Sequence, residues 1–540
     1  MPRNRTVVAR PMREIGKGLT NAVQAFLLGE NERVLEILAA GDVAPVDAGL
    51  LRARTFLRMR NENGAIEELK RISAPKLSLD QRFARDMLLA TARFRAGSRR
   101  EALRELTELA QEASGSSRLH PTVRSEVAYF YALALWGERL LPEAREIALN
   151  AIDPAGDIVY VRLLELLGWI EISQGNVTLA ARHFATGLAA FRSCTHQDAS
   201  VKSALVHGAI VLAVETLDAS LIKIARAEAE LVHWGDADRW REAQVQTYLG
   251  RLSELEGANV QAWQHFERAK HLDVKPPYRA IAMIAQANLL WHVGERFAAA
   301  RMLDDTWGIL SGVTWSQTNA EERVALLAFA FSAAQSDVAA ASQALTKARS
   351  IWEKDDPLIA FSRDDRVEAM LRQAAGAIHA ARNEVRKAVN DLRSAYEIWI
   401  RFDYRTHAVR VAQILWQLTQ DLAYRQYIES ISTVMPSAWF AKSEGNPQAN
   451  DILEKLSQAE LRVLRSLLRG DQPKKIAAEF GRSIFTIRNQ VKKVFLAFGV
   501  HSRSALVVAS ARIGIIGDDV VDAAISRDPD SVPKTRAVEH

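Results

Sequence analysis

Apolar and polar residues follow a helical period along most of the chain. From about residue 15 to residue 432, apolar positions recur every three or four residues, and short breaks contain glycine, asparagine, aspartate or serine. No stretch keeps the alternation at every second residue that a half-buried β-strand requires. The pattern therefore predicts an all-α region built from many consecutive helices.

A small residue followed four positions later by a large apolar one recurs through this region. The pairs are Ala65/Leu69, Ala102/Leu106, Ala180/Phe184, Ala262/Phe266, Ala299/Leu303, Ala341/Leu345 and Ala388/Leu392. Glycines precede several of them, at Gly97, Gly175, Gly257 and Gly294, with Gly168 and Gly250 further upstream. Small residues let the two helices of a hairpin approach closely, and the large side chain fills the gap to the next hairpin.

This pattern resembles the tetratricopeptide repeat, with Gly168, Gly175, Ala180 and Phe184 as the best copy. The copies are spaced by about 37 to 47 residues, which is longer than the 34 of that family and implies degenerate repeats with extended helices. The period predicts about nine or ten helix pairs. The resemblance implies an α-solenoid with an effector or protein partner in its concave groove, but the sequence does not indicate which residues line that groove.

Near the C-terminus, two short amphipathic segments are separated by a turn. Pro473 suits the first position of a helix, and the turn Gly481-Arg482-Ser483 ends that helix. Ser483 is a natural N-cap for a second helix, whose apolar stripe is predicted to be buried. The residues of that stripe are Ile487, Val491, Val494 and Phe498.

The opposite face of the second helix carries residues suited to DNA. Phe485, Arg488 and Asn489 lie in its N-terminal half, which is the part that enters the major groove when a helix-turn-helix docks. We expect Arg488 to read guanine, Asn489 adenine and Phe485 a thymine methyl group. Phosphate contacts are expected from other side chains, namely Lys474, Lys475, Lys492, Lys493 and Arg503. Ser483 and Thr486 complete the predicted DNA-binding set.

The wider frame of this segment is similar to the LuxR-type (GerE-like) DNA-binding domain over about 55 residues. The residues that carry the resemblance are Leu456, Ser457, Glu460, Val463, Leu464, Gly470, Ile476, Ala477, Ser483, Thr486, Ile487, Val494, Phe498, Gly499, Val500, Ser502 and Arg503. The resemblance implies a four-helix domain that binds double-stranded DNA as a homodimer. Its last helix, residues 502–512, would present the dimerisation residues Ala505, Val508, Ala509 and Arg512.

The distribution of charge along the chain supports this division into a repeat region and a DNA-binding segment. The chain of 540 residues has a formal net charge of +5. Residues 451–512 hold twelve basic and five acidic residues, a net +7, so the remaining residues sum to −2. Nearly all the excess positive charge therefore belongs to the predicted DNA-binding segment.

The resulting domain boundaries follow changes in composition. Residues 1–14 are predicted to be a disordered basic arm, 15–432 the tetratricopeptide-like domain, 433–451 a linker rich in proline, glycine and serine, 452–514 the helix-turn-helix domain, and 515–540 a disordered tail. The predicted fold class is all-α, with an α-solenoid followed by a four-helix LuxR-type helix-turn-helix domain.

Other classes of function find little support. No HExxH or GxSxG motif occurs, and the twelve histidines lack metal-ligand spacing, so we expect no enzyme activity, no metal and no cofactor. His207 is interpreted as a core histidine, and the tryptophans, Trp169 and Trp399 among them, as packing residues. A single cysteine, Cys194, and the absence of a secretory signal or a 20-residue apolar run predict a cytoplasmic protein without a membrane span.

Three interpretations remain open at this point. The first is a sequence-specific transcription regulator controlled by a ligand or protein partner. The main alternative is a tetratricopeptide scaffold or co-chaperone whose C-terminal domain contacts protein rather than DNA. Salt separates these two, because DNA binding weakens steeply as salt concentration rises. The third is an enzyme regulated by its repeats, which would need an active site assembled from dispersed residues and which a screen for turnover would test.

Overall fold

The computed structural model describes residues 17–40, 44–72, 77–312, 320–353, 365–434, 452–453, 455–468 and 471–512. Within these ranges the regular structure is helical, and no strand occurs. The predicted all-α solenoid is confirmed. The predicted basic arm, the acidic tail and all but the first two residues of the predicted linker lie outside the described residues.

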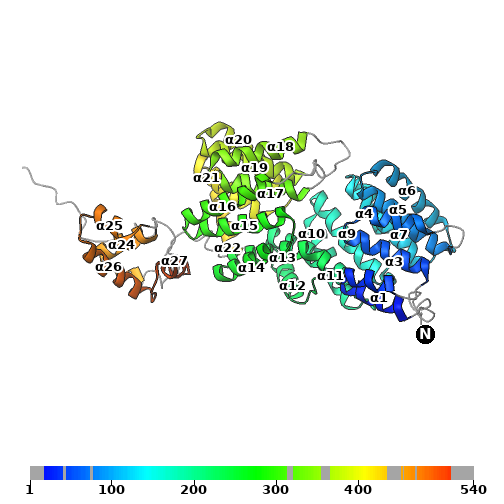
Figure 1. Ribbon diagram of the computed structural model, residues 1–540. Helices are drawn as coiled ribbons and strands as arrows, with labels where there is room; N and C mark the ends of the chain where they lie inside the picture. The colour runs from blue at the N-terminus through cyan, green and yellow to red at the C-terminus, as the bar shows by residue number, and fades with distance from the viewer. Residues whose placement is uncertain are drawn as a thin grey trace, which may run out of the picture.

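Twenty-two helices of the described residues pair in chain order into eleven hairpins (Figure 1). The first helices are α1 (Lys17–Leu28), α3 (Pro45–Arg58), α5 (Leu79–Arg95), α7 (Pro121–Gly137), α9 (Ile158–Gln174), α11 (Ala199–Thr216), α13 (Arg239–Leu255), α15 (Pro276–His292), α17 (Ala320–Ala333), α19 (Asp365–Ala381) and α21 (Arg405–Thr419). The second helices are α2 (Asn31–Ala40), α4 (Glu62–Arg71), α6 (Arg99–Gly115), α8 (Leu141–Asn150), α10 (Val177–Arg192), α12 (Ala219–Ala229), α14 (Asn259–His271), α16 (Arg296–Gly312), α18 (Val338–Glu353), α20 (Val385–Arg401) and α22 (Leu422–Val434).

Two sequence predictions about this region need correction. The structure has eleven hairpins where the average period predicted nine or ten, because the hairpins at both ends, α1/α2 and α21/α22, are shorter than that period. Helix α22 ends at Val434, so its last turn occupies the first two residues of the predicted linker. An average spacing carries no information about such short terminal hairpins.

The repeated small and large residues lie where two hairpins meet. The small members of all seven pairs are fully buried on second helices, and their large partners are buried with them. The predicted turn glycines, Gly97, Gly175, Gly257 and Gly294, all adopt positive φ after a first helix. A Cβ atom at Gly168 would lie 2.6 Å from the Phe184 ring, so only glycine admits that ring between α9 and α10.

The hairpins wind into a superhelix that returns on itself. Helix α11 contacts α1 on one side and α21 on the other, and α1 lies beside α11 in Figure 1. Each of these contacts joins first helices that are five hairpins apart. One superhelical turn therefore takes five hairpins, and α11 forms the centre shared by two successive turns.

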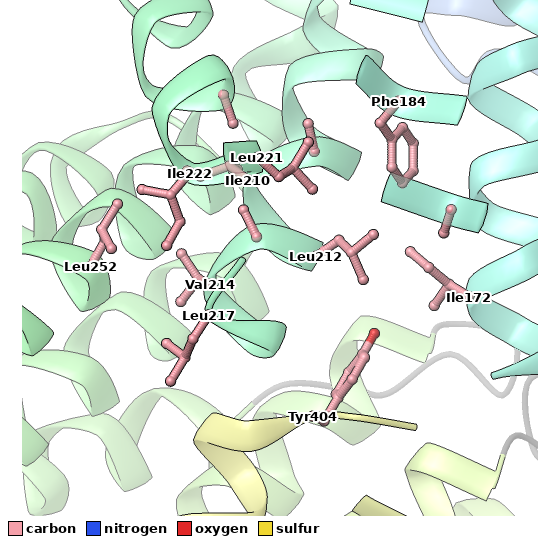
Figure 2. Packing of buried hydrophobic residues seen from close by; sticks show 14 of the residues in the cluster. Ile172, Phe184, Ile210, Leu212, Val214, Leu217, Leu221, Ile222, Leu252 and Tyr404 are labelled. Carbon is pink, nitrogen blue, oxygen red and sulfur yellow. The ribbon is translucent and has the colours of Figure 1, made fainter. Parts of the chain in front are cut away.

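Helix α11 is correspondingly apolar. Its Ile210, Leu212 and Val214 pack with Leu221 and Ile222 of α12, and Tyr404 approaches the same cluster from the segment before α21 (Figure 2). Among the described residues α11 is the one helix long and apolar enough to cross a membrane, yet 78% of its apolar window is buried inside the fold. Core helices of soluble proteins pass the same length and hydropathy test, so this helix is weak support for a membrane span.

The C-terminal segment forms a core of its own. It contains α24 (Gln458–Leu468), α25 (Pro473–Glu479), α26 (Ile484–Ala497) and α27 (Arg503–Arg512). Side chains from all four helices meet in this core, including Leu464, Ile476, Ile487, Val494 and Leu506. The short helices α25 and α26 thereby gain the tertiary contacts without which helices of their length are marginal.

Candidate functional site

Helix α26 begins where the sequence predicts. The Ser483 hydroxyl accepts a hydrogen bond from the Thr486 amide at 3.1 Å and so caps the helix. Helix α25 starts at Pro473 and ends at Glu479, and Gly481 adopts a φ of +60° in the turn between the two helices. The two helices are thus joined by a four-residue turn with fixed geometry.

The two faces of α26 differ sharply in exposure. Ile487 and Val494 are 0% exposed in the domain core, and Val491 and Phe498 are half-buried beside them. The opposite face is exposed, with Phe485, Thr486, Arg488, Asn489, Lys492 and Lys493 all open to solvent. The residues predicted to read bases therefore lie together on one accessible surface, which we call the α26 face.

The predicted phosphate-binding lysines have different surroundings. Lys474 and Lys492 are exposed, whereas Lys475 pairs with Asp471 at 2.6 Å. Lys493 contacts Glu460 of α24 at 3.0 Å. Arg503, at the start of α27, is half-buried and has interactions of its own. Lys493 thus ties α26 to α24, a contact that the sequence did not predict.

Glu460 connects this contact to the start of α24. Its carboxylate accepts a hydrogen bond from the Ser457 amide at 2.9 Å, and the Glu460 amide donates to the Ser457 hydroxyl at 3.4 Å. Burial by itself raises the pKa of Glu460, but the Ser457 amide and the Lys493 ammonium more than offset it and lower that pKa below its usual value. The carboxylate is therefore held in the charged form that orients Lys493.

Helix α27 uses one face for the domain core. Leu506, Val507 and Ser510 are buried, while the predicted dimerisation residues Ala505 and Ala509 are half-buried. Val508 and Arg512 belong to the same helix, and their side chains lie outside the described residues. Ala505 and Ala509 are one turn apart, so they share a face of α27.

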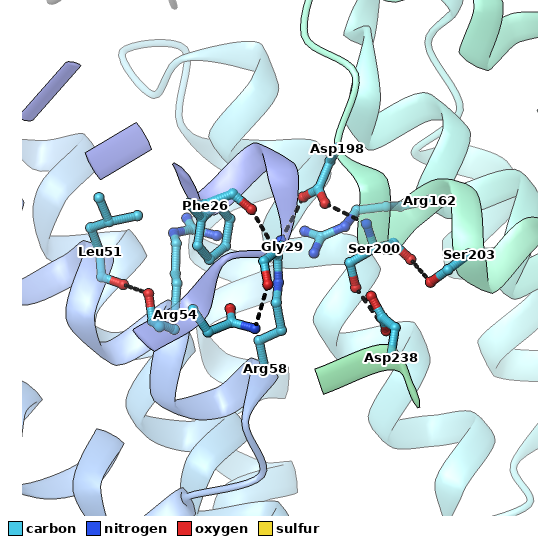
Figure 3. A network of polar contacts seen from close by, with 12 residues as sticks. Phe26, Gly29, Leu51, Arg54, Arg58, Arg162, Asp198, Ser200, Ser203 and Asp238 are labelled. Carbon is cyan, nitrogen blue, oxygen red and sulfur yellow. Dashed lines mark hydrogen bonds and ion pairs between the residues drawn. The ribbon is translucent and has the colours of Figure 1, made fainter. Parts of the chain in front are cut away.

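A second polar site lies where the first superhelical turn closes. Arg58 of α3 pairs with Asp198 at 2.6 Å, and its guanidinium stacks on the Phe26 ring at 3.6 Å from the ring centroid (Figure 3). Both side chains of the ion pair are almost completely buried. Burial is the main reason that the pKa of Arg58 is lowered, with nearby Arg162 acting in the same direction. This contact, the Arg58–Asp198 latch, fastens the beginning of the solenoid to α11.

First helices of successive hairpins contribute a ladder of rings beside this latch. Trp169, His207, Trp240 and Tyr278 come from α9, α11, α13 and α15, and consecutive ring centroids are 5.6 to 5.7 Å apart. Burial and the nearby Arg241 lower the pKa of His207 to about 4, so this histidine is neutral near pH 7. The interpretation of His207 as a core residue is confirmed. Trp399, 1% exposed and bonded to Gln373, is likewise a packing residue.

The surroundings of Cys194 disfavour its thiolate form. Burial and the neighbouring Asp157 raise the pKa of its thiol to about 12, so the nucleophilic thiolate is scarce at neutral pH. No group of three or more potential metal ligands occurs among the described residues.

Sequence reasoning missed the charged residues on the inner side of the first superhelical turn, including Arg60, Arg95 and Arg162. Each lies on or just after the first helix of a different hairpin. The sequence signal that could have indicated these residues is the arginine repeated near the ends of α3 and α5. Its meaning depends on the closure of the turn, which a linear pattern does not encode.

No family model matches the chain, and no curated protein matches it. Several solved structures are similar to the chain at low identity. They include the apo form of the quorum sensor NprR from B. thuringiensis, at 13% identity over 66% of this chain and 97% of that chain with a TM-score of 0.42. They also include a Rap protein complexed with Competence and Sporulation Factor, at 10% identity over 71% and 99% with a TM-score of 0.36. The APC/C hetero-tetramer Cut9-Hcn1 is 12% identical over 75% and 85% with a TM-score of 0.26. The LuxR-type resemblance of the C-terminal domain stays a prediction.

Proposed function

We propose that the protein is a sequence-specific DNA-binding transcription regulator, with no catalytic role, whose C-terminal domain resembles the LuxR type. The observation that carries the proposal is the division of α26 into a buried apolar side and an accessible polar side. Ile487 and Val494 anchor the helix in the domain, and Arg488 and Asn489 remain available on its leading turns. A capped helix held in this way can enter a major groove without leaving its own core.

The charge around α26 supports the same proposal. Lys474 and Lys492 are exposed on α25 and α26, where they suit phosphate contacts on both sides of a groove. Arg488 and Asn489 have the donor patterns that match guanine and adenine edges. The predicted homodimer would form through Ala505, Val508, Ala509 and Arg512 of α27 and would bind two half-sites about one helical turn apart.

The solenoid would regulate DNA binding by the C-terminal domain. Its inner face is assembled from first helices of successive hairpins, so a ligand or partner protein bound there would contact several hairpins at once. Such a ligand would regulate DNA binding by favouring the conformation or dimer that fits the operator. We place this regulator in the cytoplasm, in agreement with its single, unreactive cysteine.

Selection of genomic DNA fragments on the full-length protein tests the proposal. Enriched fragments are then titrated by fluorescence anisotropy at several salt concentrations. We expect affinity to fall linearly on a log–log plot, with a slope of about −0.9 for each neutralised phosphate. A scrambled fragment of equal length is the control. Absence of an enriched sequence, with equal affinity for the scrambled fragment, contradicts sequence-specific regulation.

One observation favours the alternative of a scaffold with a protein-binding C-terminal domain. Helix α26 also exposes two large apolar side chains, Phe485 at 73% and Leu496 at 81%. Exposed apolar residues of this size are typical of protein contacts when they form a patch. A Leu496→Ser variant distinguishes the two functions, because a regulator should keep its DNA affinity while a scaffold should lose its partner.

A further inference from the structure

The inner side of the first superhelical turn gathers more guanidinium groups than free carboxylates. Arg162 lies over the Tyr129 ring at 5.4 Å, and Arg60 lies over the Trp240 ring at 5.1 Å. Arg95 interacts electrostatically with Arg60, Arg162 and Tyr129. We call these five residues the arginine hollow. They come from five different hairpins, and so the superhelical winding alone brings them together.

Four of the nearby acids are already engaged, and a fifth, Glu62, interacts electrostatically with Arg95. Glu126 forms a two-point ion pair with Arg54, including a contact of 2.8 Å, so Arg162 reaches it only at 3.8 Å. Asp198 belongs to the latch, and Asp238 pairs with Arg241. Glu165 accepts a hydrogen bond from Trp169 at 2.8 Å, and burial raises its pKa, which weakens it as a counter-charge.

Arg95 is held by a hydrogen bond to the backbone. Its guanidinium donates to the Leu57 carbonyl at 3.1 Å. Desolvation lowers its pKa; Tyr129 and Glu62 act against this, whereas the like charges of Arg60 and Arg162 act with it. Its side chain is nevertheless accessible to water. The guanidinium is therefore open to solvent although protein groups surround it.

We propose that the arginine hollow binds a small, multiply charged anion bearing carboxylate or phosphate groups. Such an anion would replace guanidinium repulsion with charge-assisted hydrogen bonds, and the planar forks of Arg60, Arg95 and Arg162 suit bidentate contacts to either group. Binding of the anion does not depend on the proposed function. Only the role of the anion as an effector of DNA binding rests on that function. By bridging hairpins of the first turn, the anion would stiffen the part of the solenoid fastened by the latch.

Arg60 offers a substitution that removes charge without harming the fold. Its φ is +57°, at a turn position where five other hairpins have glycine. A non-glycine residue in this conformation costs about 1 kcal/mol. Arg60→Gly therefore removes one guanidinium while relieving backbone strain, so lost binding in this variant is not explained by unfolding.

Isothermal titration of the full-length protein in the absence of DNA tests the site. The probes are pyrophosphate and citrate, each compared with sodium chloride at equal ionic strength. We expect saturable binding, weakened at least about tenfold by Arg60→Gly and by Arg95→Gln, since each removes charge-assisted hydrogen bonds. Arg100→Gln, which removes an exposed arginine of α6, is the matched control and should bind as the wild type does.

Each outcome has a defined meaning. Binding of pyrophosphate alone assigns the hollow to phosphate ligands, and binding of citrate alone assigns it to carboxylates. Binding of both anions supports recognition of negative charge, which phosphate and carboxylate groups have in common. Heats equal to those of sodium chloride, or binding unchanged in both hollow variants, overturn the proposal. Because DNA is absent, this result is independent of the genomic selection that tests the regulator function.

Discussion

Neighbouring residues of α26 differ in exposure, because successive positions of a helix point in different directions. Arg488 and Asn489 follow the buried Ile487 directly, yet both are open to solvent. Lys492 lies one turn after Arg488 on the same face. The proposed function assigns base contacts to Arg488 and Asn489 and a phosphate contact to Lys492.

Substitution of Arg488 and Lys492 tests this distinction. Arg488→Ala should cost about 1 to 3 kcal/mol on the selected DNA and relax specificity at one base position. Lys492→Ala should weaken binding to all sequences about equally and reduce the salt slope by about 1. Anisotropy titrations on a set of single-base operator variants measure both effects. An equal loss on every sequence for both substitutions would remove Arg488 from the reading role.

The protonation of His207 predicts how the solenoid responds to acid. Its pKa of about 4 lies below the usual value of about 6.5, so between these values the unfolded chain binds a proton that the folded chain rejects. Stability should therefore fall as pH drops from 6.5 towards 4, by at most about 1.4 kcal/mol per pH unit from this group. Thermal melts at pH 7.5 and 5.0 should show a smaller difference for His207→Gln than for the wild type. The exposed control His233→Gln should retain the wild-type difference.

At the scale of the element, a hairpin is defined by how closely its two helices approach. The Phe184 ring lies against Gly168 of α9 and Gly208 of α11, where added Cβ atoms would be 2.6 and 2.4 Å from it. One aromatic side chain thereby joins its own hairpin to the next. The same arrangement recurs at Gly250 and Phe266.

Gly168→Ala should therefore destabilise the solenoid by about 1 to 3 kcal/mol, since the methyl group overlaps a ring with no free space around it. Chemical denaturation followed by circular dichroism measures the loss. The second substitution Phe184→Leu should recover part of it by vacating the ring position. Gly308→Ala is the control, because its Cβ would enter open space and should stabilise α16 by up to about 1 kcal/mol. Equal effects at both glycines would contradict the packing argument.

For the whole molecule, the important contacts are those between hairpins far apart in sequence. The latch joins Arg58 to Asp198 across 140 residues, and Glu215 of α11 contacts both Arg251 and Thr406. These bonds fix the superhelical winding, which simple stacking of neighbouring hairpins leaves free.

Breaking the latch should loosen the N-terminal hairpin. Arg58→Gln leaves the Asp198 carboxylate buried and unpaired, which typically costs about 3 to 5 kcal/mol. Hydrogen–deuterium exchange should rise in α1 and in the N-terminal part of α11. Arg33→Gln, which breaks the exposed Arg33–Glu30 pair at 3.1 Å, is the control and should leave exchange nearly unchanged. Unchanged exchange in Arg58→Gln would show that the latch does not hold the turn closed.

Local patterns by themselves determined the helices, the small and large residues between hairpins, and the two sides of α26, because helical period, capping and turn chemistry act over a few residues. The Ser483 cap and the buried Ile487 follow from such rules. Only the tertiary structure decided that one turn takes five hairpins, that Arg58 meets Asp198, and that Arg95 comes within electrostatic range of Arg60 and Arg162. The winding is the sum of small rotations between hairpins, each set by the packing of many side chains, so no single stretch of sequence contains it.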